Sequence, residues 1–302
     1  MLGIVLMIAG IFLISIKDAG SKFLVSGYHP FQIMALSAWL TIVMLLFWTI
    51  ISNKNPEGIR KFKTKYWKQH FVRSVIGVFA GVFFLYSLKY LKFVDVTVIF
   101  FSAPIFMTAL SAFFLKEQVG FIRWSAVLVG FVGVIIAMQP DLGNLDSLDN
   151  LGEIKNFDWK YMLPVGAALA YATRMTLVRT MAGLESASQI VFHTRLGGAL
   201  LTTIPMYFVW QNMNAADMAL LLAFTFVQLL AHLLITQSTV LASLSLVGPI
   251  EYTALLWNVI LGYFIWNEVP NDNIWIGSIF IISAGLVVAY REALHKKRLK
   301  RL

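Results

Sequence analysis

The sequence predicts an all-α polytopic membrane protein with ten transmembrane helices, arranged as two inverted five-helix repeats. Its 302 residues are 59% hydrophobic and only 13% charged, whereas soluble domains carry about 25% charged residues. Ten apolar runs follow one another along the chain, and two segments, one in each half, share a common pattern. These observations indicate that lipid is the solvent for most of the surface.

Each apolar run holds the roughly 20 residues that a helix needs to cross a hydrocarbon core of about 30 Å. The first run starts at residue 2 without a basic leader or a small-residue cleavage site, so we expect a membrane helix and not a removable signal peptide. In chain order the predicted helices span residues 2–25, 31–52, 71–91, 94–115, 123–139, 161–180, 188–210, 218–240, 246–266 and 274–291.

The loops between these helices differ in charge, which predicts the orientation of the chain. Lysine and arginine accumulate between residues 54 and 73 and in the C-terminal tail, so both segments are expected on the cytoplasmic side. The loop after the fifth helix is rich in aspartate and is expected outside, with Lys89 and Lys92 lying there against the trend. An even number of helices then places both termini in the cytoplasm.

The sequence has no cysteine, which excludes a disulfide framework and thiolate chemistry. The net charge of +9 is carried in short blocks between apolar runs, which is a topology signal and not a nucleic-acid-binding face. No helix carries an HExxH, GxSxG or paired-aspartate motif. We therefore expect no enzyme, no cofactor, no metal and no nucleic-acid partner.

The acidic loop divides the chain into a first repeat of residues 1–140, a connecting loop of residues 141–160 and a second repeat of residues 161–302 with a basic tail. When Glu117 is aligned with Glu268, a tryptophan follows seven residues later in both halves, at Trp124 and Trp275. Because each unit has five helices, an odd number, the units must insert in opposite orientations. This is the inverted repeat found in many secondary transporters.

Two longer segments extend this pattern. Residues 94–140 read VDVTVIFFSAPIFMTALSAFFLKEQVGFIRWSAVLVGFVGVIIAMQP, and residues 248–270 read GPIEYTALLWNVILGYFIWNEVP. In these segments the chain resembles the drug/metabolite transporter superfamily, specifically its EamA-type ten-helix members. Many relatives carry an arginine in the second helix near Ser37 or Ala38, where this chain reads FQIMALSAWL, so that arginine's substrate contact is not carried over.

The resemblance implies a secondary transporter that moves a small organic metabolite across a bacterial inner membrane by alternating access. The alternative is a non-transporting membrane receptor or assembly partner with a transporter fold. The implied partners are a small-molecule substrate, the lipid bilayer and, if transport is coupled, protons. The sequence defines neither the direction of transport nor an oligomeric state.

Polar and aromatic side chains inside apolar helices are the candidate substrate contacts, because each polar group is costly in lipid. Gln228 and His232 form a stripe at i, i+4 on the eighth helix, for which helix-to-helix hydrogen bonding is the alternative. Aromatic faces with few charges suit a small, flat or zwitterionic organic molecule, and the resemblance implies a zwitterionic or cationic amino acid, nucleotide-derived or vitamin-like metabolite. The predicted substrate-binding residues are Tyr86, Tyr171, Gln228, His232, Tyr252, Trp257 and Asn258.

Charged groups at comparable inner depth are candidates for gating or coupling. Glu251 lies at the depth of Arg174, His193 and Arg195, so we expect it to pair with Arg174 or Arg195. The pair serves either as an inner gate or as a purely structural ion pair. Glu251 and His232 are also the candidates for proton coupling, because burial raises the pKa of a carboxylate and histidine titrates near neutrality.

The outer part of the bundle offers further candidates. Asp18 lies in the outer third of the first helix, where it either forms a charged wall of the outward mouth or pairs with Lys22 at i+4. Pro104 and Pro249 lie inside the fourth and ninth helices and remove backbone donors there. They are therefore the predicted hinges.

Overall fold

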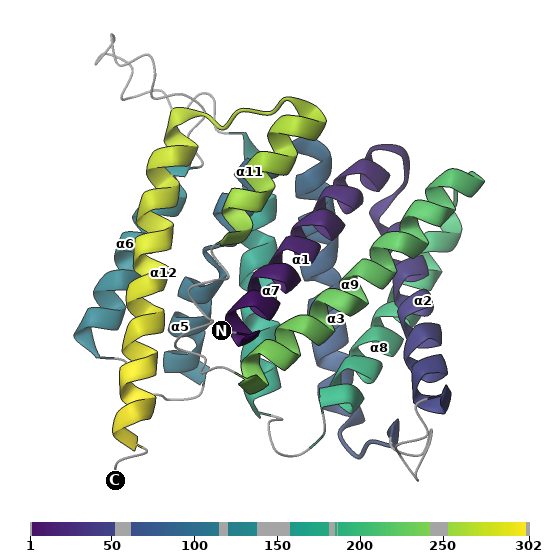
Figure 1. Cartoon of the computed structure of the whole chain (residues 1–302), viewed down its shortest axis with the longest axis horizontal. Coiled ribbons are helices and arrows are strands. Elements are labelled where there is room, and N and C mark those ends of the chain that lie inside the picture. Colours follow the sequence, from purple (N-terminus) through teal and green to yellow (C-terminus); the bar gives the residue numbers. More distant parts are fainter. Residues whose placement is uncertain are drawn as a thin grey trace.

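The computed structural model describes residues 2–51, 62–114, 120–137, 158–180, 185, 187–241 and 253–299 (Figure 1). Nearly all of these residues are helical, and the predicted all-α polytopic fold is confirmed. The elements are α1 (Leu2–Gly27), α2 (Pro30–Ile51), α3 (Trp67–Tyr90), α4 (Phe93–Phe100), α5 (Ala103–Phe114), α6 (Phe121–Ala137), the short helix η3 (Trp159–Tyr161), α7 (Met162–Thr180), α8 (Ala187–Phe208), α9 (Ala215–Leu241), α11 (Thr253–Trp266) and α12 (Asp272–Leu299).

The described helices differ in how well they suit lipid. By length and composition, those able to cross a membrane are Leu2–Gly27, Pro30–Ile51, Trp67–Tyr90, Phe93–Phe114 and Ala215–Ile235. α6, α11 and α12 contain shorter apolar stretches. α7 and α8 are less apolar because they carry Arg174 and Arg195 among their residues. Such helices need protein or water beside their charges, which favours positions against other helices.

The fourth predicted helix is two helices in the structure. α4 ends at Phe100 and α5 begins at Ala103. Pro104 has no backbone N–H, and its ring excludes the preceding turn of a continuous helix. The chain therefore turns and restarts, with the Ile105 N–H donating to the carbonyl of Ser102 at 3.0 Å. The predicted hinge at Pro104 coincides with this break, and movement there stays a prediction.

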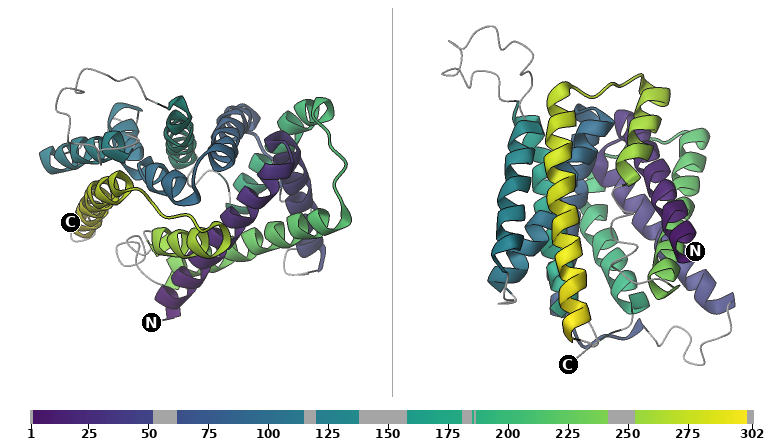
Figure 2. Two further views of the ribbon diagram at one scale, coloured as in Figure 1. Left: turned by 90° about the horizontal axis from the view of Figure 1, so that it is seen from above. Right: turned by 60° about the vertical axis from the view of Figure 1, so that its left-hand side comes forward.

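The contacts between helices of the two halves form a symmetric pattern. α2 packs on α8 and α6 packs on α12, so each of these helices contacts its counterpart in the other repeat. α1 packs on α9, and its counterpart α7 packs on α3, the counterpart of α9. In the same way, α5 packs on α7, and its counterpart α11 packs on α1. All of these pairs join the halves. The two repeats are therefore interleaved, with α6 beside α12 at one edge of the bundle (Figures 1 and 2).

Glycines allow two of these pairs to approach closely. Where α6 crosses α12, a Cβ added at Gly277 would lie 2.7 Å from the carbonyl oxygen of Gly133, and one at Gly133 would lie 2.9 Å from the carbonyl oxygen of Gly277. Where α1 crosses α9, the ring of Phe224 occupies the space that a side chain at Gly20 would need. Small residues at such crossings are what lets membrane helices gain packing energy in lipid.

The two ends of the bundle are named after the charges that the sequence places between the helices there. We call the acidic end the one at which α1 ends, α7 begins and α11 turns into α12, and the basic end the one at which α2 ends and α3 begins. A buried cluster at the acidic end links α1, α2, α3, α4 and α9. Its least exposed members include Leu24, Val25, Leu88, Phe93 and Leu221.

Candidate functional site

α9 turns one face into the bundle, and this face carries the predicted polar stripe. Leu221 and Thr225 are both 2% exposed, so the face points inward. Gln228 and His232 continue the stripe at i+3 and i+7 from Thr225. Gln228 is half-buried, whereas His232 is exposed. An exposed side chain on an inward face needs a solvent-accessible space beside it, so we infer that the bundle is hollow next to His232.

Three cationic side chains from other helices lie near His232. The positive charges of Arg195 on α8, Lys17 on α1 and Arg174 on α7 all act on it electrostatically. Arg195 shares a helix face with Ala199 and Thr202 at i+4 and i+7. Both neighbours are fully buried, so this face of α8 also points inward. Helices from both halves thus bring positive charge to one region.

Aromatic rings lie in a row beside these cations. The guanidinium carbon of Arg174 is 5.2 Å from the ring centroid of Tyr171. The rings of Tyr171 and Phe100 are 5.4 Å apart, and those of Phe100 and Phe84 are 5.2 Å apart. At the other end of the row, the Nζ atom of Lys17 lies 5.9 Å from the centroid of Phe84. Rings and cations in this arrangement suit a flat organic molecule that carries a charged group.

An ion pair joins the halves at the acidic end. Lys22 of α1 pairs with Glu268, which lies in the turn between α11 and α12, and its Nζ atom is 4.9 Å from the ring centroid of Trp266. The backbone N–H of Phe93 donates to Oε2 of Glu268 at 2.6 Å. The two side chains are only 11% and 16% exposed, so water screens the pair weakly. We call Lys22 with Glu268 the acidic-end clasp.

Further hydrogen bonds join the halves at the same end. The Tyr28 hydroxyl donates to Oδ2 of Asp217 at 2.7 Å. Gln32 exchanges two hydrogen bonds with the backbone of Gln211, at 2.7 and 3.0 Å. Lys92, which departs from the charge trend, donates to the turn between α11 and α12. Together with the clasp, these contacts hold the two halves together at the acidic end.

A polar network at the basic end connects α3 with α8. Glu185 is hydrogen-bonded to Nε2 of His70 at 2.7 Å and accepts a hydrogen bond from the Thr64 hydroxyl. Arg73 donates to Nδ1 of His70 at 3.2 Å and to Oγ1 of Thr194 at 2.8 Å. Because a guanidinium only donates, Nδ1 of His70 accepts, and its Nε2 carries the proton toward Glu185.

His193, a predicted gating or coupling residue, belongs to this network. Its Nε2 atom donates to the carbonyl of Phe62 at 2.7 Å, and its ring centroid lies 4.5 Å from that of His70. His193 is therefore near the basic end, where it fixes the chain ahead of α3 against α8.

Several predicted substrate residues lie apart from the cation group. The Tyr86 hydroxyl is hydrogen-bonded to Nε2 of His29 at 2.8 Å, in the turn between α1 and α2 at the acidic end. Trp257 packs against a buried cluster of α1. The Asn258 side chain donates to Oγ1 of Thr97 at 2.8 Å and is 4% exposed, so it joins α11 to α4. Their predicted contact with substrate stays a prediction.

The expected pair between Asp18 and Lys22 does not form. Asp18 lies 2.5 Å from the Nζ atom of Lys17, whereas Lys22 pairs with Glu268. Glu268, in the turn between α11 and α12, binds Lys22, and Asp18 pairs with Lys17 instead. The predicted residues Pro249, Glu251 and Tyr252 lie outside the described residues, so the expected pairing of Glu251 is not described.

The sequence does not single out every charged residue that the structure brings into contact. Glu268 belongs to the repeated spacing of glutamate and tryptophan, but that spacing does not predict the clasp, and nothing in the sequence marks Lys17 as the partner of Asp18. His70 and Glu185 lie in loops or first turns, where polar residues are ordinary. Asp95 begins the fourth helix, yet it is 1% exposed and accepts a hydrogen bond from the Tyr161 hydroxyl at 3.4 Å. A carboxylate within an apolar run was the available signal.

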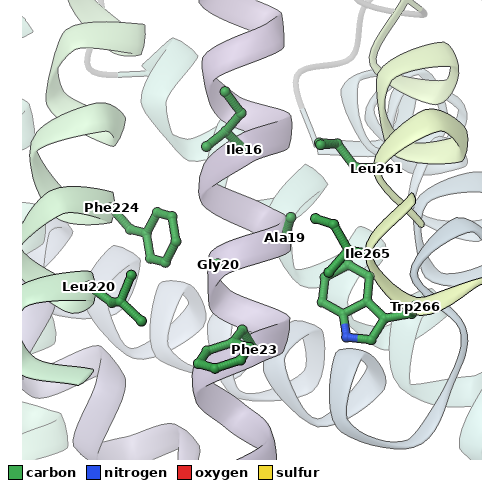
Figure 3. A pocket seen from close by; sticks show the side chains of 9 residues that line it. All are labelled: Ile16, Ala19, Gly20, Phe23, Leu220, Phe224, Leu261, Ile265 and Trp266. Carbon is green, nitrogen blue, oxygen red and sulfur yellow. The ribbon is translucent and has the colours of Figure 1, made fainter. Parts of the chain in front are cut away.

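A separate apolar cavity of about 270 Å³ lies between α1, α9 and α11 (Figure 3). None of the predicted substrate residues that the structure describes lines it, and the described residues of its walls carry no charged group. Its lining residues are Ile16, Ala19, Gly20, Phe23, Leu220, Phe224, Leu261, Ile265 and Trp266. It therefore differs in chemistry from the hollow beside His232.

Comparisons with known proteins place the chain among transporters. Residues 1–139 match the EamA-like transporter family. An S-adenosylmethionine uptake transporter of Rickettsia bellii is 26% identical over 94% of this chain and 92% of its own length. A riboflavin transporter of Vibrio cholerae is 29% identical over 80% of this chain and 78% of its own length.

One solved structure, titled "Crystal structure of protein", shares the fold. It superposes with a TM-score of 0.62 at 15% identity and covers 98% of both chains. At this identity the likeness concerns the fold alone.

Proposed function

Because this chain is a membrane transporter of the EamA type within the drug/metabolite transporter superfamily, we propose that it moves a small organic metabolite by alternating access. The matched relatives are transporters and not enzymes. The hollow beside His232 is the proposed substrate site, and the acidic-end clasp is the proposed gate on one side of it. Both termini are proposed to face the cytoplasm from a bacterial inner membrane.

The packing of the helices supports alternating access. When each helix is replaced by its counterpart in the other half, the contacts between the halves recur. In such a symmetric arrangement two repeats can rock around one central site. At the acidic end the halves are held by an ion pair and hydrogen bonds. Ion pairs and hydrogen bonds of this kind can break and reform as the site turns to the other side.

The relatives that align over most of the chain carry the substrate proposal. Four of them, all from Rickettsia species, are named S-adenosylmethionine uptake transporters and cover 92% to 94% of this chain. S-Adenosylmethionine combines a flat adenine with a charged amino-acid group. The aromatic row of Phe84, Phe100 and Tyr171 supports binding of a flat ring system. A metabolite of this class is therefore the first substrate to test.

Riboflavin is the second candidate, because the riboflavin transporter relative has the higher identity over a shorter stretch of the chain. Its ring system is flat and uncharged, so it would use the aromatic row without the cations. Proton coupling through His232 or Glu251 remains part of the proposal and concerns either substrate.

Flux into proteoliposomes tests the proposed function. The purified chain is reconstituted, and uptake of labelled S-adenosylmethionine and labelled riboflavin is measured with and without a pH gradient. We expect saturable uptake of one of them above protein-free liposomes, competed by the unlabelled compound. Flux equal to that of protein-free liposomes for both compounds and for a panel of amino acids and nucleosides would favour the non-transporting receptor instead.

A further inference from the structure

The hollow beside His232 holds positive charge deep within the membrane span. With a rise of 1.5 Å per residue, Arg174 lies about 9 Å, Arg195 about 12 Å and Lys17 about 22 Å from the basic end of its helix. His232 lies about 14 Å from that end. A hydrocarbon core is about 30 Å thick, so these groups occupy its interior. Charges at such depth are costly and normally face a cavity or a partner.

The described part of the chain supplies little counter-charge to Arg174 and Arg195. Asp18 pairs with Lys17, and Arg195, Lys17 and Arg174 each act on His232 with a positive charge. Among the described residues, no group accepts a hydrogen bond from the buried Nε of Arg174. Arg195 is affected by burial and by the positive charge of Arg174, and no described carboxylate contributes to its electrostatics. Both arginines therefore lie without a described carboxylate partner in a region where unpaired charges are expensive.

The side chain of Arg174 is held toward the middle of the membrane and does not extend to the nearer surface. α7 starts at the acidic end, so Tyr171 lies one turn closer to that end than Arg174. The guanidinium carbon nevertheless lies 5.2 Å from the Tyr171 ring centroid. A snorkelling arginine would point the other way, toward the basic end. The aliphatic part of Arg174 passes Gly77 of α3, where a Cβ would come within 3.2 Å of Cδ.

We propose that Arg174 and Arg195, with Lys17 and His232 beside them, bind an anionic oxygen group of the transported substrate, a carboxylate or a phosphate. The inference rests on the proposed transport function and names the substrate class for the same site. Guanidinium groups suit both anions because two parallel N–H donors match two oxygens. The aromatic row then holds the rest of the molecule. The expected substrate is an organic acid with a flat ring, and not a simple cation.

Matched pairs of ligands test this site directly. Thermal unfolding of the purified full chain is followed with methionine against methioninamide, and with adenosine monophosphate against adenosine. Each pair differs mainly in the anionic group, so the first pair reports a carboxylate and the second a phosphate. We expect one of the compounds with an anionic group to raise the unfolding temperature saturably while its partner without that group does not, because only a ligand that binds the folded state stabilises it.

Variants then assign the effect to the arginines. Arg195→Gln and Arg174→Gln are expected to weaken binding of the acid by about 10- to 100-fold, the usual range for losing a hydrogen bond to a charged group. Arg195→Lys keeps the charge but lacks the planar guanidinium, so its affinity for the acid should lie between that of the parent chain and that of Arg195→Gln. Lys160→Gln is the control, because it removes one positive charge from an exposed pair with Asp158. Its binding should equal that of the parent chain.

The outcomes separate this inference from the proposed function. Arginine-dependent binding of an acid without uptake of S-adenosylmethionine or riboflavin supports the site and contradicts those substrates. Uptake that is unchanged in both Arg→Gln variants overturns the site and leaves transport standing. The absence of arginine-dependent stabilisation by either acid at millimolar concentration also overturns it. Should one variant fail to fold, the other arginine and the lysine replacement still give the answer.

Discussion

Replacing Glu268 with glutamine should loosen the acidic end by an amount that the structure bounds. Glutamine keeps an acceptor for the Phe93 N–H, which donates to Glu268 at 2.6 Å, but it removes the charge that pairs with Lys22. Both side chains are less than one-fifth exposed, so a partly desolvated charged hydrogen bond is lost. Such a bond contributes about 2 kcal/mol, which corresponds to roughly 30-fold in the equilibrium between closed and open acidic ends.

The chain has no cysteine, so one introduced thiol reports this equilibrium without background. Ser15 is fully buried and lies two turns along α1 from Lys22 on the same face. A membrane-impermeant maleimide is added to vesicles of either orientation that contain the Ser15→Cys protein. From the side of the acidic end, labelling should be about 30-fold faster after Glu268→Gln, because the reagent reaches the thiol only when that end opens.

A double-mutant cycle distinguishes loss of the clasp from general loosening. Lys22→Met should accelerate labelling as well, and the double variant should be little faster than either single one, because both remove the same interaction. Lys160→Gln should leave the rate unchanged. A labelling rate within twofold of the parent in Glu268→Gln would refute the role of the clasp, and equal acceleration in the control would trace the change to the fold as a whole.

Two further predictions concern stability. Gly277→Val should lower the free energy of unfolding by about 1–3 kcal/mol, because its Cβ would meet the carbonyl oxygen of Gly133 at 2.7 Å; thermal unfolding checks this against Gly198→Ala, where nothing lies within 4 Å. The pKa of His29 lies below its ordinary value of 6.5 because of burial and then the charge of Lys89, so the folded state favours neutral imidazole. Its contribution to stability is complete above pH 6.5 and is lost as the pH falls. His29→Gln should therefore reduce the loss of thermal stability on acidification, and an unchanged pH profile would contradict this.

The sequence by itself determined the all-α polytopic fold, and it predicted the repeat and the polar stripe of α9. A segment in lipid must satisfy its backbone hydrogen bonds within itself, so length and apolarity specify a spanning helix without reference to its neighbours. The spacing of Glu268 and Trp275 against Glu117 and Trp124 predicts the duplication, and it too depends only on the order of residues along the chain. His232 could be placed on an inward face because helical periodicity is local.

Only the tertiary structure decided which charged groups meet. Lys22 and Glu268 are 246 residues apart, and His70 and Glu185 are 115 residues apart, so their pairing depends on how the halves interleave. Depth along a helix suggested Asp18 as the partner of Lys22, but it could not reveal the nearer carboxylate of another helix turn. Arg174 and Arg195 come near His232 for the same reason. The position of a residue along its helix gives its depth in the membrane, but a site also depends on how the helices are arranged around one another.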